Sequence, residues 1–342
     1  MLILVTGGAG YIGSHVCLAL LDKGFDVVVA DNLCNGNVEA IERVEKITGK
    51  TIDFHEVDIR DEDSLATVFW QHPIDAVIHL AGLKAVNDSV KNPLDYYDNN
   101  VVGTLSLCKV MKESGVKTLV FSSSSAVYGD ATKVPVSEIS DLNPVSPYGR
   151  SKLMVENVLK DLQASDSTWQ IALLRYFNPV GAHLNGLIGD SPVTAINSLF
   201  TQIVKHRKST LHVFGFDYDT VDGTCVRDYI HVVDLATGHL KALDYLRALH
   251  SLEKKYRSKE PFIWNLGTGH GYSVMQVIEA FESVIGERIP YLISPRRAGD
   301  IQACYADVSK ANRELDWRAK KNIFEMCASA WNWHKLNPKG FN

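Results

Sequence analysis

The chain has 342 residues, of which 46% are hydrophobic and 22% are charged, and its formal net charge is −5. These values are ordinary for a globular protein, which excludes disorder and a fibrous repeat. No basic block is present to bind nucleic acid, and no apolar run approaches the roughly 20 residues that a membrane span needs. Six scattered cysteines show neither metal-ligand nor disulfide spacing, so we expect reduced thiols, a cytoplasmic protein and no metal.

Short apolar runs alternate with amphipathic stretches in the first half of the chain. Strands are predicted at 2–6, 26–31, 51–58, 75–81, 118–123 and 170–177, and helices near 11–23, 37–48, 62–71, 94–114 and 147–164. Near-continuous Val/Ile/Leu strands separated by helices predict βαβ units around a parallel sheet that is buried on both faces. The expected fold is therefore α/β, with a doubly wound Rossmann-type sheet.

The rhythm of the pattern breaks after residue 178, where glycine and proline become frequent. We place a domain boundary there, so that residues 1–178 form the Rossmann domain and residues 179–342 a smaller, mixed α/β domain. An apolar run that ends in a glycine turn at 262–269 resembles another sheet strand. It predicts that the chain returns to the first domain near 227–270.

A glycine-rich turn, VTGGAGYIGSH, follows the first strand. Gly7 permits the tight turn, Gly10 lets the backbone approach a pyrophosphate, and Gly13 lets the helix pack closely on the strand. The helix N-terminus adds N–H donors and partial positive charge. Asp31 ends the second strand, where a carboxylate accepts hydrogen bonds from a ribose diol and repels a 2′-phosphate. The alternative is a turn with a helix-capping aspartate, but this context predicts NAD. Asp58 also ends a strand and either meets the adenine or caps a helix.

The sequence SPYGRSK places Tyr148 and Lys152 four residues apart. On a helix these positions share one face, so the ammonium can lie beside the phenol. Tyrosine has an ordinary pKa of about 10, which is too high for a base at neutral pH. A neighbouring lysine and a positive nicotinamide both favour the phenolate. After a dinucleotide turn, the pair therefore predicts a base that removes a hydroxyl proton; an exposed helical pair is the alternative.

Longer motifs resemble the UDP-galactose (UDP-glucose) 4-epimerases of the extended short-chain dehydrogenase/reductase family. They are TGGAGYIG, HLAGLKAV, YYDNNVVGT, YGRSK, LLRYFNPVGAH, VRDYIHVVDLA and PRRAGD, and they run nearly end to end. The resemblance implies a tightly held NAD and no net redox change. C4 of the sugar is oxidised, the 4-keto intermediate turns, and hydride returns to its other face. It also implies a homodimer through the helices near 94–114 and 147–164.

The resemblance further implies a role for individual residues. Tyr148 is the base, Lys152 is its electrostatic partner, and Ser124 binds O4 of the sugar. Cofactor contacts, with Tyr148 and Lys152, are implied for Gly7, Gly10, Tyr11, Ile12, Gly13, Asp31, Asn32, Asp58, Ile59, Ala81, Gly82, Lys84, Asn99, Ser122, Tyr176 and Phe177. UDP-sugar contacts, with Ser124 and Tyr148, are implied for Lys84, Asn178, Leu199, Phe214, Arg227, Tyr229, Arg297, Asp300 and Cys304.

Some positions depart from the family pattern or leave an alternative open. Ser198 stands where the family has an asparagine, so no role is assigned to it. Arg227 has a second interpretation, an ion pair with Asp228 or Asp234. Arg296, beside the predicted UDP ligand Arg297, is expected to be solvated.

Two other functions share the cofactor site. Sugar-nucleotide dehydratases and UDP-glucuronate decarboxylases resemble one another in carrying a carboxylate after the strand end, where this chain has Ser125 and Ala126. A non-catalytic NAD-binding regulator has no use for Tyr148 and Lys152. Cys304 occupies the position that, in the resemblance, faces C2 of the sugar, and a small residue there leaves room for an N-acetyl group. We therefore also expect turnover of UDP-GlcNAc and UDP-GalNAc.

Overall fold

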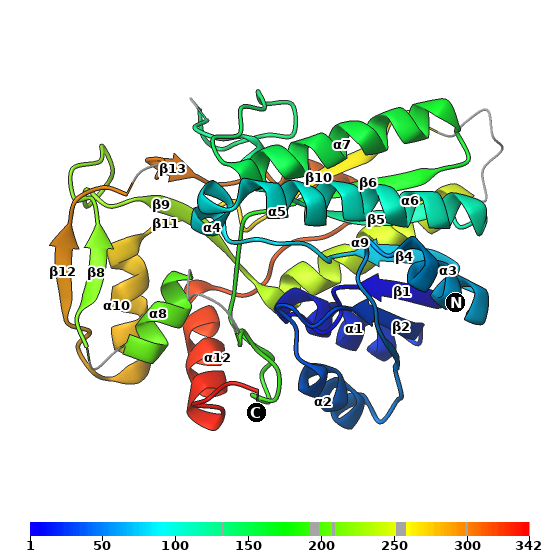
Figure 1. Cartoon of the computed structure of the whole chain (residues 1–342). Helices are drawn as coiled ribbons and strands as arrows, with labels where there is room; N and C mark the ends of the chain where they lie inside the picture. The colour runs from blue at the N-terminus through cyan, green and yellow to red at the C-terminus, as the bar shows by residue number, and fades with distance from the viewer. Residues whose placement is uncertain (132, 192–197, 207–208, 251–257, 298–299, 342) are drawn as a thin grey trace.

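A sheet of seven parallel strands forms the centre of the larger part of the molecule (Figure 1). The computed structural model describes residues 1–341 except 132, 192–197, 207–208, 251–257 and 298–299. The strand order is β10-β6-β5-β4-β1-β2-β3, and all neighbours are parallel. The strands are β1 (Leu2–Thr6), β2 (Asp26–Asp31), β3 (Asp53–Glu56), β4 (Ala76–His79), β5 (Thr118–Ser124), β6 (Gln170–Tyr176) and β10 (Phe262–Leu266). The order reverses between β1 and β4, so the predicted doubly wound fold is confirmed.

Helices cover both faces of this sheet (Figure 1). On one face lie α1 (Tyr11–Asp22), α2 (Val38–Thr48), α9 (Val232–His250) and α11 (Ser309–Leu315). On the other lie α3 (Glu62–Gln71), α4 (Val86–Lys91), α5 (Pro93–Tyr97), the π-helical turn η1 (Asp98–Val102), α6 (Gly103–Glu113) and α7 (Pro147–Ser165). The two hydrophobic clusters between sheet and helices explain why the strands read as continuous apolar runs.

The second half of the chain builds two small sheets and three helices beside the large sheet (Figure 1). One sheet joins β7 (Asn178–Val180), β9 (Val226–His231), β11 (Gly271–Ser273) and β13 (Ala303–Cys304). The other pairs β8 (Leu211–Phe214) with β12 (Tyr291–Ser294). The helices α8 (Leu199–His206), α10 (Val274–Ile285) and α12 (Ile323–Leu336) pack around a third hydrophobic cluster. Between these elements the chain re-enters the large sheet, because α9 packs on it and β10 pairs with β6.

Two predicted elements differ from those observed. The strand predicted at 51–58 is limited to β3, and the helix predicted at 94–114 is α5, η1 and α6 in succession, with α4 before it. Asn100, in η1, exchanges hydrogen bonds with both backbone groups of Leu83, at 2.8 and 3.0 Å. Asn100 thus binds the loop before α4 from within the wide π-helical turn η1. The spacing of apolar residues alone does not reveal such a turn.

The carboxyl ends of the parallel strands meet at one edge of the sheet. The glycine turn follows β1, Asp31 ends β2, Ser124 ends β5 and Tyr176 ends β6. Ser124 and Tyr176 are direct partners in the β5–β6 register. In open α/β sheets ligands bind at this edge, where the strand order reverses.

Candidate active site

The turn after β1 consists of residues 7–10, three glycines and one alanine, so its backbone is almost bare of side chains. A Cβ on Gly7, whose φ is +73°, would lie 2.6 Å from the nitrogen of Ala81, and a Cβ on Gly13 would lie 2.1 Å from the oxygen of Gly7. Gly10 is the N-cap of α1 and supplies no side-chain cap to the N–H groups of the first turn, which include those of Tyr11 and Ile12. Uncapped N–H groups with the helix dipole behind them suit a pyrophosphate, so these residues fit a dinucleotide.

Asp31 is 7% exposed, and its side chain binds the loop after β1 and the loop after β2. Its carboxylate accepts hydrogen bonds from the N–H of Ala9 at 3.0 Å and from that of Leu33 at 2.9 Å. Burial raises the pKa of this carboxyl, and the two backbone N–H groups oppose the rise. Each oxygen keeps lone pairs free, so the carboxylate can also accept from a ribose diol.

Asp58 and Asn32 form a polar pair beside the end of β2. The amide of Asn32 donates to Asp58 at 2.9 Å, and the guanidinium of Arg60 pairs with the same carboxylate at 2.8 Å. These hydrogen bonds, Arg60 first, lower the pKa of Asp58. Asp61, not Asp58, caps α3, so the alternative that Asp58 is a helix cap is wrong. Ile59 is buried in the hydrophobic cluster.

The segment after β4 lies next to α7, the helix that carries Tyr148 and Lys152. A Cβ on Gly82 would lie 3.5 Å from Nζ of Lys152, so the backbone at Ala81 and Gly82 passes close to that ammonium. Lys84 is exposed, and its Nζ lies 5.7 Å from the ring centroid of Tyr11. Asn99 is 8% exposed and its side chain makes no hydrogen bond within the described ranges of the chain. Its amide is not among the buried side-chain atoms that lack a partner, so it is open to the surroundings and can bind a ligand.

Tyr148 and Lys152 occupy successive turns of α7, which begins at the N-cap Ser146. The Nζ of Lys152 donates to the carbonyl oxygen of Ser122 at 2.8 Å. Burial lowers the pKa of Lys152 to about 8, and the Glu156 carboxylate opposes this effect. The hydroxyl of Ser124 accepts from the N–H of Ala126 at 3.1 Å. The helix α7 therefore brings Tyr148, the predicted base, and Lys152 to the carboxyl end of β5.

The sequence predicts a lowered pKa for the Tyr148 phenol, but the surroundings of this residue in the structure raise it. Burial raises this pKa, and hydrogen bonding with Ser124 only partly opposes the rise. Lys152, whose ammonium donates to the carbonyl of Ser122, is not among the groups that shift this pKa. The protein alone thus keeps Tyr148 protonated at neutral pH.

Tyr176 and Phe177 are both buried where β6 ends. The hydroxyl of Tyr176 donates to Nε2 of His239, and a hydrogen bond with Ser122 connects it to β5. Phe177 packs in a small cluster with Tyr128 and Cys304. The structure thus brings the two predicted nicotinamide neighbours next to the strand that carries Ser122 and Ser124.

The predicted UDP-sugar residues of β7, β9 and β13 share one small sheet. Asn178 is exposed and pairs with Tyr229, and Arg227 pairs with Cys304 in the strand register. Tyr229 is buried against Phe200, with ring centroids 5.4 Å apart.

Arg227 is available for a ligand within the described residues. Its Nη1 donates to the carbonyl of Val226 at 2.9 Å. The carboxylate of Asp228 accepts from Thr268, Gly269 and Ala306, and that of Asp234 accepts from two backbone N–H groups at 2.8 Å. The alternative of an ion pair with either aspartate is therefore wrong.

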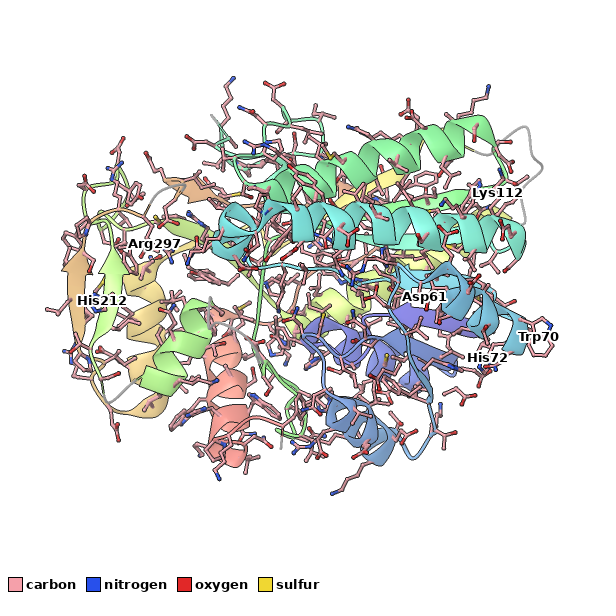
Figure 2. The ribbon with its side chains drawn as sticks, viewed as in Figure 1. Asp61, Trp70, His72, Lys112, His212 and Arg297 are labelled. Carbon is pink, nitrogen blue, oxygen red and sulfur yellow. The ribbon has the colours of Figure 1, made fainter. Side chains whose placement is uncertain are left out.

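Arg297 lies beside the β8–β12 pair (Figure 2), where it contacts Asp300 and Phe214. The guanidinium of Arg297 pairs with Asp300 at 2.9 Å and lies 4.8 Å from the ring centroid of Phe214. Leu199 begins α8 and packs partly into the third cluster. Arg296 is exposed, as expected for a solvated side chain, and pairs with Asp217 at 2.8 Å on the surface.

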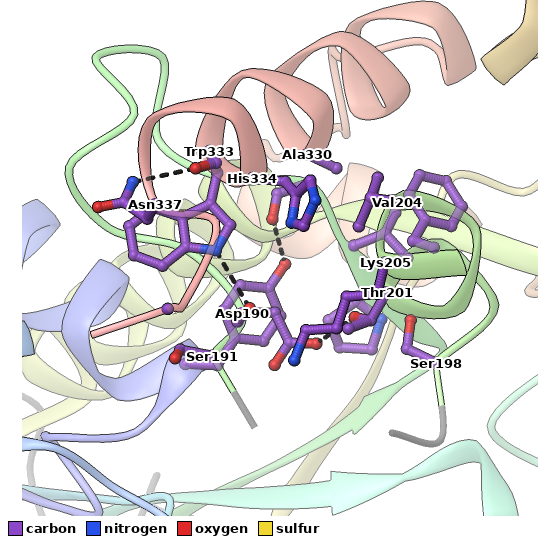
Figure 3. A pocket seen from close by; sticks show the side chains of 16 residues that line it. Asp190, Ser191, Ser198, Thr201, Val204, Lys205, Ala330, Trp333, His334 and Asn337 are labelled. Atoms are coloured by element: carbon purple, nitrogen blue, oxygen red, sulfur yellow. Dashed lines mark hydrogen bonds between the residues drawn. The ribbon is translucent and has the colours of Figure 1, made fainter. Parts of the chain in front are cut away.

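A small pocket lies away from Tyr148, between α8, α12 and the segment after β7 (Figure 3). Thr201 donates to the carboxylate of Asp190 at 2.8 Å, and the indole of Trp333 donates to the carbonyl of Asp190 at 3.1 Å. Of the predicted site residues only Tyr11 lines it. This pocket therefore does not define the reaction centre.

Sequence reasoning missed a buried polar network behind the site. Glu156 and Arg175 are 0% and 1% exposed in their side chains and pair at 2.6 Å. Ser123 donates to Glu156 at 2.5 Å, and Arg175 donates to the hydroxyl of Tyr128 at 3.0 Å. The available signal was position, since Ser123 and Arg175 each adjoin a predicted site residue and Glu156 lies one turn after Lys152. Among the described residues, no cluster of His, Cys, Asp or Glu could hold a metal ion.

Comparison with known proteins identifies the family to which this chain belongs. Residues 4–330 match the family model described as GDP-mannose 4,6 dehydratase. The UDP-glucose 4-epimerase of Bacillus subtilis is 51% identical, over 100% of this chain and 99% of that protein. A UDP-glucose 4-epimerase from Bifidobacterium longum, solved with NAD+ and UDP, has a TM-score of 0.94 at 50% identity and covers 100% of both chains. Another, from Stenotrophomonas maltophila with NAD and formylated UDP-arabinopyranose, has a TM-score of 0.94 at 45% identity, covering 99% of both chains.

The fold, the glycine turn and the Tyr148–Lys152 pair define a sugar-nucleotide enzyme of the extended short-chain dehydrogenase/reductase class. Within that class the full-length matches at about half identity are to epimerases. The chain belongs to the UDP-glucose 4-epimerase family, and the family predicted from the sequence is confirmed.

Proposed function

We propose that the chain is an NAD-dependent isomerase that interconverts UDP-glucose and UDP-galactose. The observation that carries this proposal is the meeting of Tyr148, Lys152 and Ser124 at the carboxyl ends of β5 and β6, beside the glycine turn. NAD, when bound, supplies the acceptor that takes hydride from C4 and returns it. In the division of labour that we propose, residues 1–178 and the returning β10 hold the cofactor, and residues 179–342 hold the UDP-sugar.

The side chains of the site perform the proton chemistry. Tyr148 takes the proton of the sugar 4-hydroxyl and later gives one back, and Ser124 holds O4 by a hydrogen bond. Lys152 adds positive charge to this edge, and its anchoring on Ser122 fixes its position. No second acid or base is required, because the hydride returns to C4 of the sugar and the proton returns to O4.

The cofactor and substrate contacts are part of the same proposal. The uncapped turn from Gly10 to Gly13 receives the pyrophosphate and Asp31 the ribose, with Asn99 as a further partner. Arg227 and Arg297 receive the diphosphate of UDP, since both guanidinium groups keep donors free for an anion. The remaining contacts follow the sequence prediction.

A dehydratase or decarboxylase is the second candidate, since the matching family model carries a dehydratase description. Those reactions remove a second proton or a carboxyl group and need a carboxylate after β5. Here that position is η2 (Ser125–Val127), which contains Ser125 and Ala126. Neither side chain is a carboxylate, so this observation favours the epimerase.

The test of the reaction is Tyr148→Phe, with Tyr97→Phe as a matched control outside the site. The product, UDP-glucose from UDP-galactose, is measured with a coupled dehydrogenase, and bound NAD is measured after release. We expect the first variant to keep NAD and lose at least about 10²-fold in kcat, and the control to behave as the unsubstituted protein. Near-normal turnover by Tyr148→Phe would contradict the mechanism. Steady release of NADH with substrate would favour an oxidoreductase.

We also propose that N-acetylated UDP-hexoses are substrates. Cys304 is 5% exposed, lies next to Arg227 in the strand register, and packs with Phe177 and Tyr128. It therefore stands between the proposed diphosphate site and the proposed nicotinamide neighbours, where the sugar ring belongs. A small side chain there leaves space beside the ring.

The scope is tested by comparing kcat/KM for UDP-glucose, UDP-galactose, UDP-GlcNAc and UDP-GalNAc. Cys304→Tyr should lose the acetylated pair and keep the other, because its ring fills the space. Cys304→Ser, which keeps the volume, is the control and should keep both pairs. If the unsubstituted protein ignores the acetylated sugars, the proposed scope is wrong.

We further propose that the protein is a homodimer. The helices α4, α5 and α6 follow one another in a row, and α7 lies alongside that row (Figure 1). Several apolar side chains of these helices and of η1 are exposed. These are Val86, Val90, Leu94, Val102, Leu105 and Met154. Leu94, at 78% exposure, is the most accessible of them, and such a patch commonly marks an interface. Leu94→Asp should give monomers in analytical ultracentrifugation. Trp70→Asp is the control, since Trp70 is exposed at the far end of α3 (Figure 2).

A cytoplasmic location completes the proposal. The six cysteines are all unpaired in the structure, as a reducing compartment permits. No helix in the described ranges is long and apolar enough to cross a membrane. Cell fractionation with an epitope-tagged chain tests the location, and recovery in a membrane or secreted fraction would contradict it.

A further inference from the structure

His239 is a fully buried histidine that the proposed proton chemistry does not use. It lies on α9, which packs on β5 and β6, and its side chain is 0% exposed. Its Nδ1 lies 2.9 Å from the carbonyl oxygen of Leu235, and its Nε2 contacts the hydroxyl of Tyr176. The rings of His239 and Tyr176 also pack together, with centroids 5.2 Å apart.

These contacts fix which atoms carry the hydrogens. A carbonyl oxygen only accepts, so Nδ1 of His239 carries the hydrogen and donates it to Leu235. Burial lowers the pKa of His239 to about 4, so the imidazole is neutral and Nε2 is a bare acceptor. The hydroxyl of Tyr176 therefore donates its hydrogen to the imidazole.

Tyr176 is a second phenol at the reaction centre. It is the strand partner of Ser124. Burial raises the pKa of its hydroxyl, a hydrogen bond with Ser122 opposes the rise, and Tyr148 adds to it. The titratable groups that act on it are Tyr148 from α7 and His239 from α9. No charged side chain among the described residues perturbs His239 itself. A hydroxyl hydrogen at this place that lost its acceptor would turn toward Ser122, the other hydrogen-bond partner of Tyr176.

We propose that His239 is a positioning residue: it commits the hydroxyl hydrogen of Tyr176 to the protein core and leaves proton exchange with the sugar to Tyr148. The inference rests on the proposed function, since it assigns the base to Tyr148. It predicts that the effect of His239 on the reaction passes through Tyr176. A residue that served only to fill the core would have no such dependence.

The test is a double-variant cycle with the NAD-loaded enzyme. His239→Leu removes the acceptor, His239→Gln keeps one, Tyr176→Phe removes the hydroxyl, and the double variant combines the first and third. We measure the pH profile of kcat and the thermal midpoint of each. His239→Leu should lower kcat about tenfold and move the acid limb of the profile to lower pH, because the freed hydroxyl hydrogen then turns toward the edge that carries Ser122 and favours the negative charge of the Tyr148 phenolate. His239→Gln should restore the profile.

The double variant decides between the two roles. If His239 acts through Tyr176, the double variant has the same profile as Tyr176→Phe alone, and the losses are not additive. An unshifted profile in His239→Leu, or additive losses, overturns the proposal. If His239→Leu does not fold, His239→Asn, whose amide is too short to reach the hydroxyl, takes its place in the same cycle. Tyr148→Phe is included, because its retained turnover would overturn the proposed function, whereas its inactivity with an unshifted His239→Leu profile overturns only the role of His239.

Discussion

The glycines of the first turn separate two effects that usually occur together, loss of folding stability and loss of cofactor binding. A Cβ on Gly13 would lie 2.1 Å from the oxygen of Gly7 and 2.7 Å from Cα of Gly8, both backbone atoms. A Cβ on Gly10 would meet only the oxygen of Gly7, at 3.3 Å, and the φ of −81° and ψ of 177° there suit alanine. The methyl group of Gly10→Ala otherwise faces the open space where the pyrophosphate is proposed.

The expected magnitudes follow from these contacts. Ordinary carbon contacts lie at about 3.5 Å or more, so Gly13→Ala forces the turn and α1 apart by more than about 1 Å. Overpacking costs about 1–3 kcal/mol when side chains can yield, and here only backbone is available, so we expect about 3 kcal/mol. Gly10→Ala should change the free energy of unfolding by at most about 0.5 kcal/mol, because alanine also restricts the unfolded chain.

Both quantities are measurable on the same samples. Urea unfolding of NAD-free protein gives the free energy of unfolding, and the NAD content of freshly purified protein gives cofactor retention. We expect Gly13→Ala to lose both stability and NAD. Gly10→Ala should lose NAD alone, with binding at least about tenfold weaker, because a loss of about 1.4 kcal/mol in binding free energy corresponds to a tenfold change in Kd. Equal destabilisation by the two variants, or stoichiometric NAD in Gly10→Ala, would refute this account of the turn.

Two further predictions concern buried charge. Glu156→Gln should lower the free energy of unfolding, measured in urea, by about 3–5 kcal/mol, because it leaves the guanidinium of Arg175 buried without its counter-ion. The double variant Glu156→Gln with Arg175→Met should recover part of that loss. A larger loss of stability in the double variant would contradict this reasoning. The second concerns His79, whose pKa burial lowers from 6.5 to about 3. Its neutral form is favoured in the native state, so its contribution is complete above pH 6.5 and is lost as pH falls, at up to about 1.4 kcal/mol per pH unit. The dependence of unfolding free energy on pH should therefore be shallower in His79→Asn; an unchanged slope between about pH 6 and about pH 5 would contradict it.

The parts of the site that depend on local spacing could be predicted from the sequence. The glycine turn and the four-residue separation of Tyr148 and Lys152 are each contained in one strand end or one helix. The β-strands of the large sheet were likewise visible, since burial on both faces makes them continuous apolar runs.

The rest of the site depends on contacts between distant segments. The hydroxyl of Tyr128 reaches the side chain of Asn265, 137 residues away, and Tyr176 reaches His239 across 63 residues. Strands such as β13, with two residues, and β7, with three, are too short to show a period. Sequence patterns therefore indicate that β10 exists without showing which strand it contacts.

The same distinction applies to the charge of Tyr148, and it leads to a final prediction. Burial holds the pKa of Tyr148 above 10, whereas a base at neutral pH needs a value near 7, a difference of at least about 4 kcal/mol. Lys152 alone does not supply it, since burial outweighs the other groups that act on this pKa and Lys152 is not one of them. A second positive charge must act on the phenol, and the nicotinamide ring of oxidised NAD carries one. Reducing the bound cofactor to NADH removes that charge, so the pKa of Tyr148 should rise. Tyrosinate absorbance measured against pH for the two forms, with Tyr148→Phe as the blank, checks this. Identical titrations would show that the protein alone activates the base.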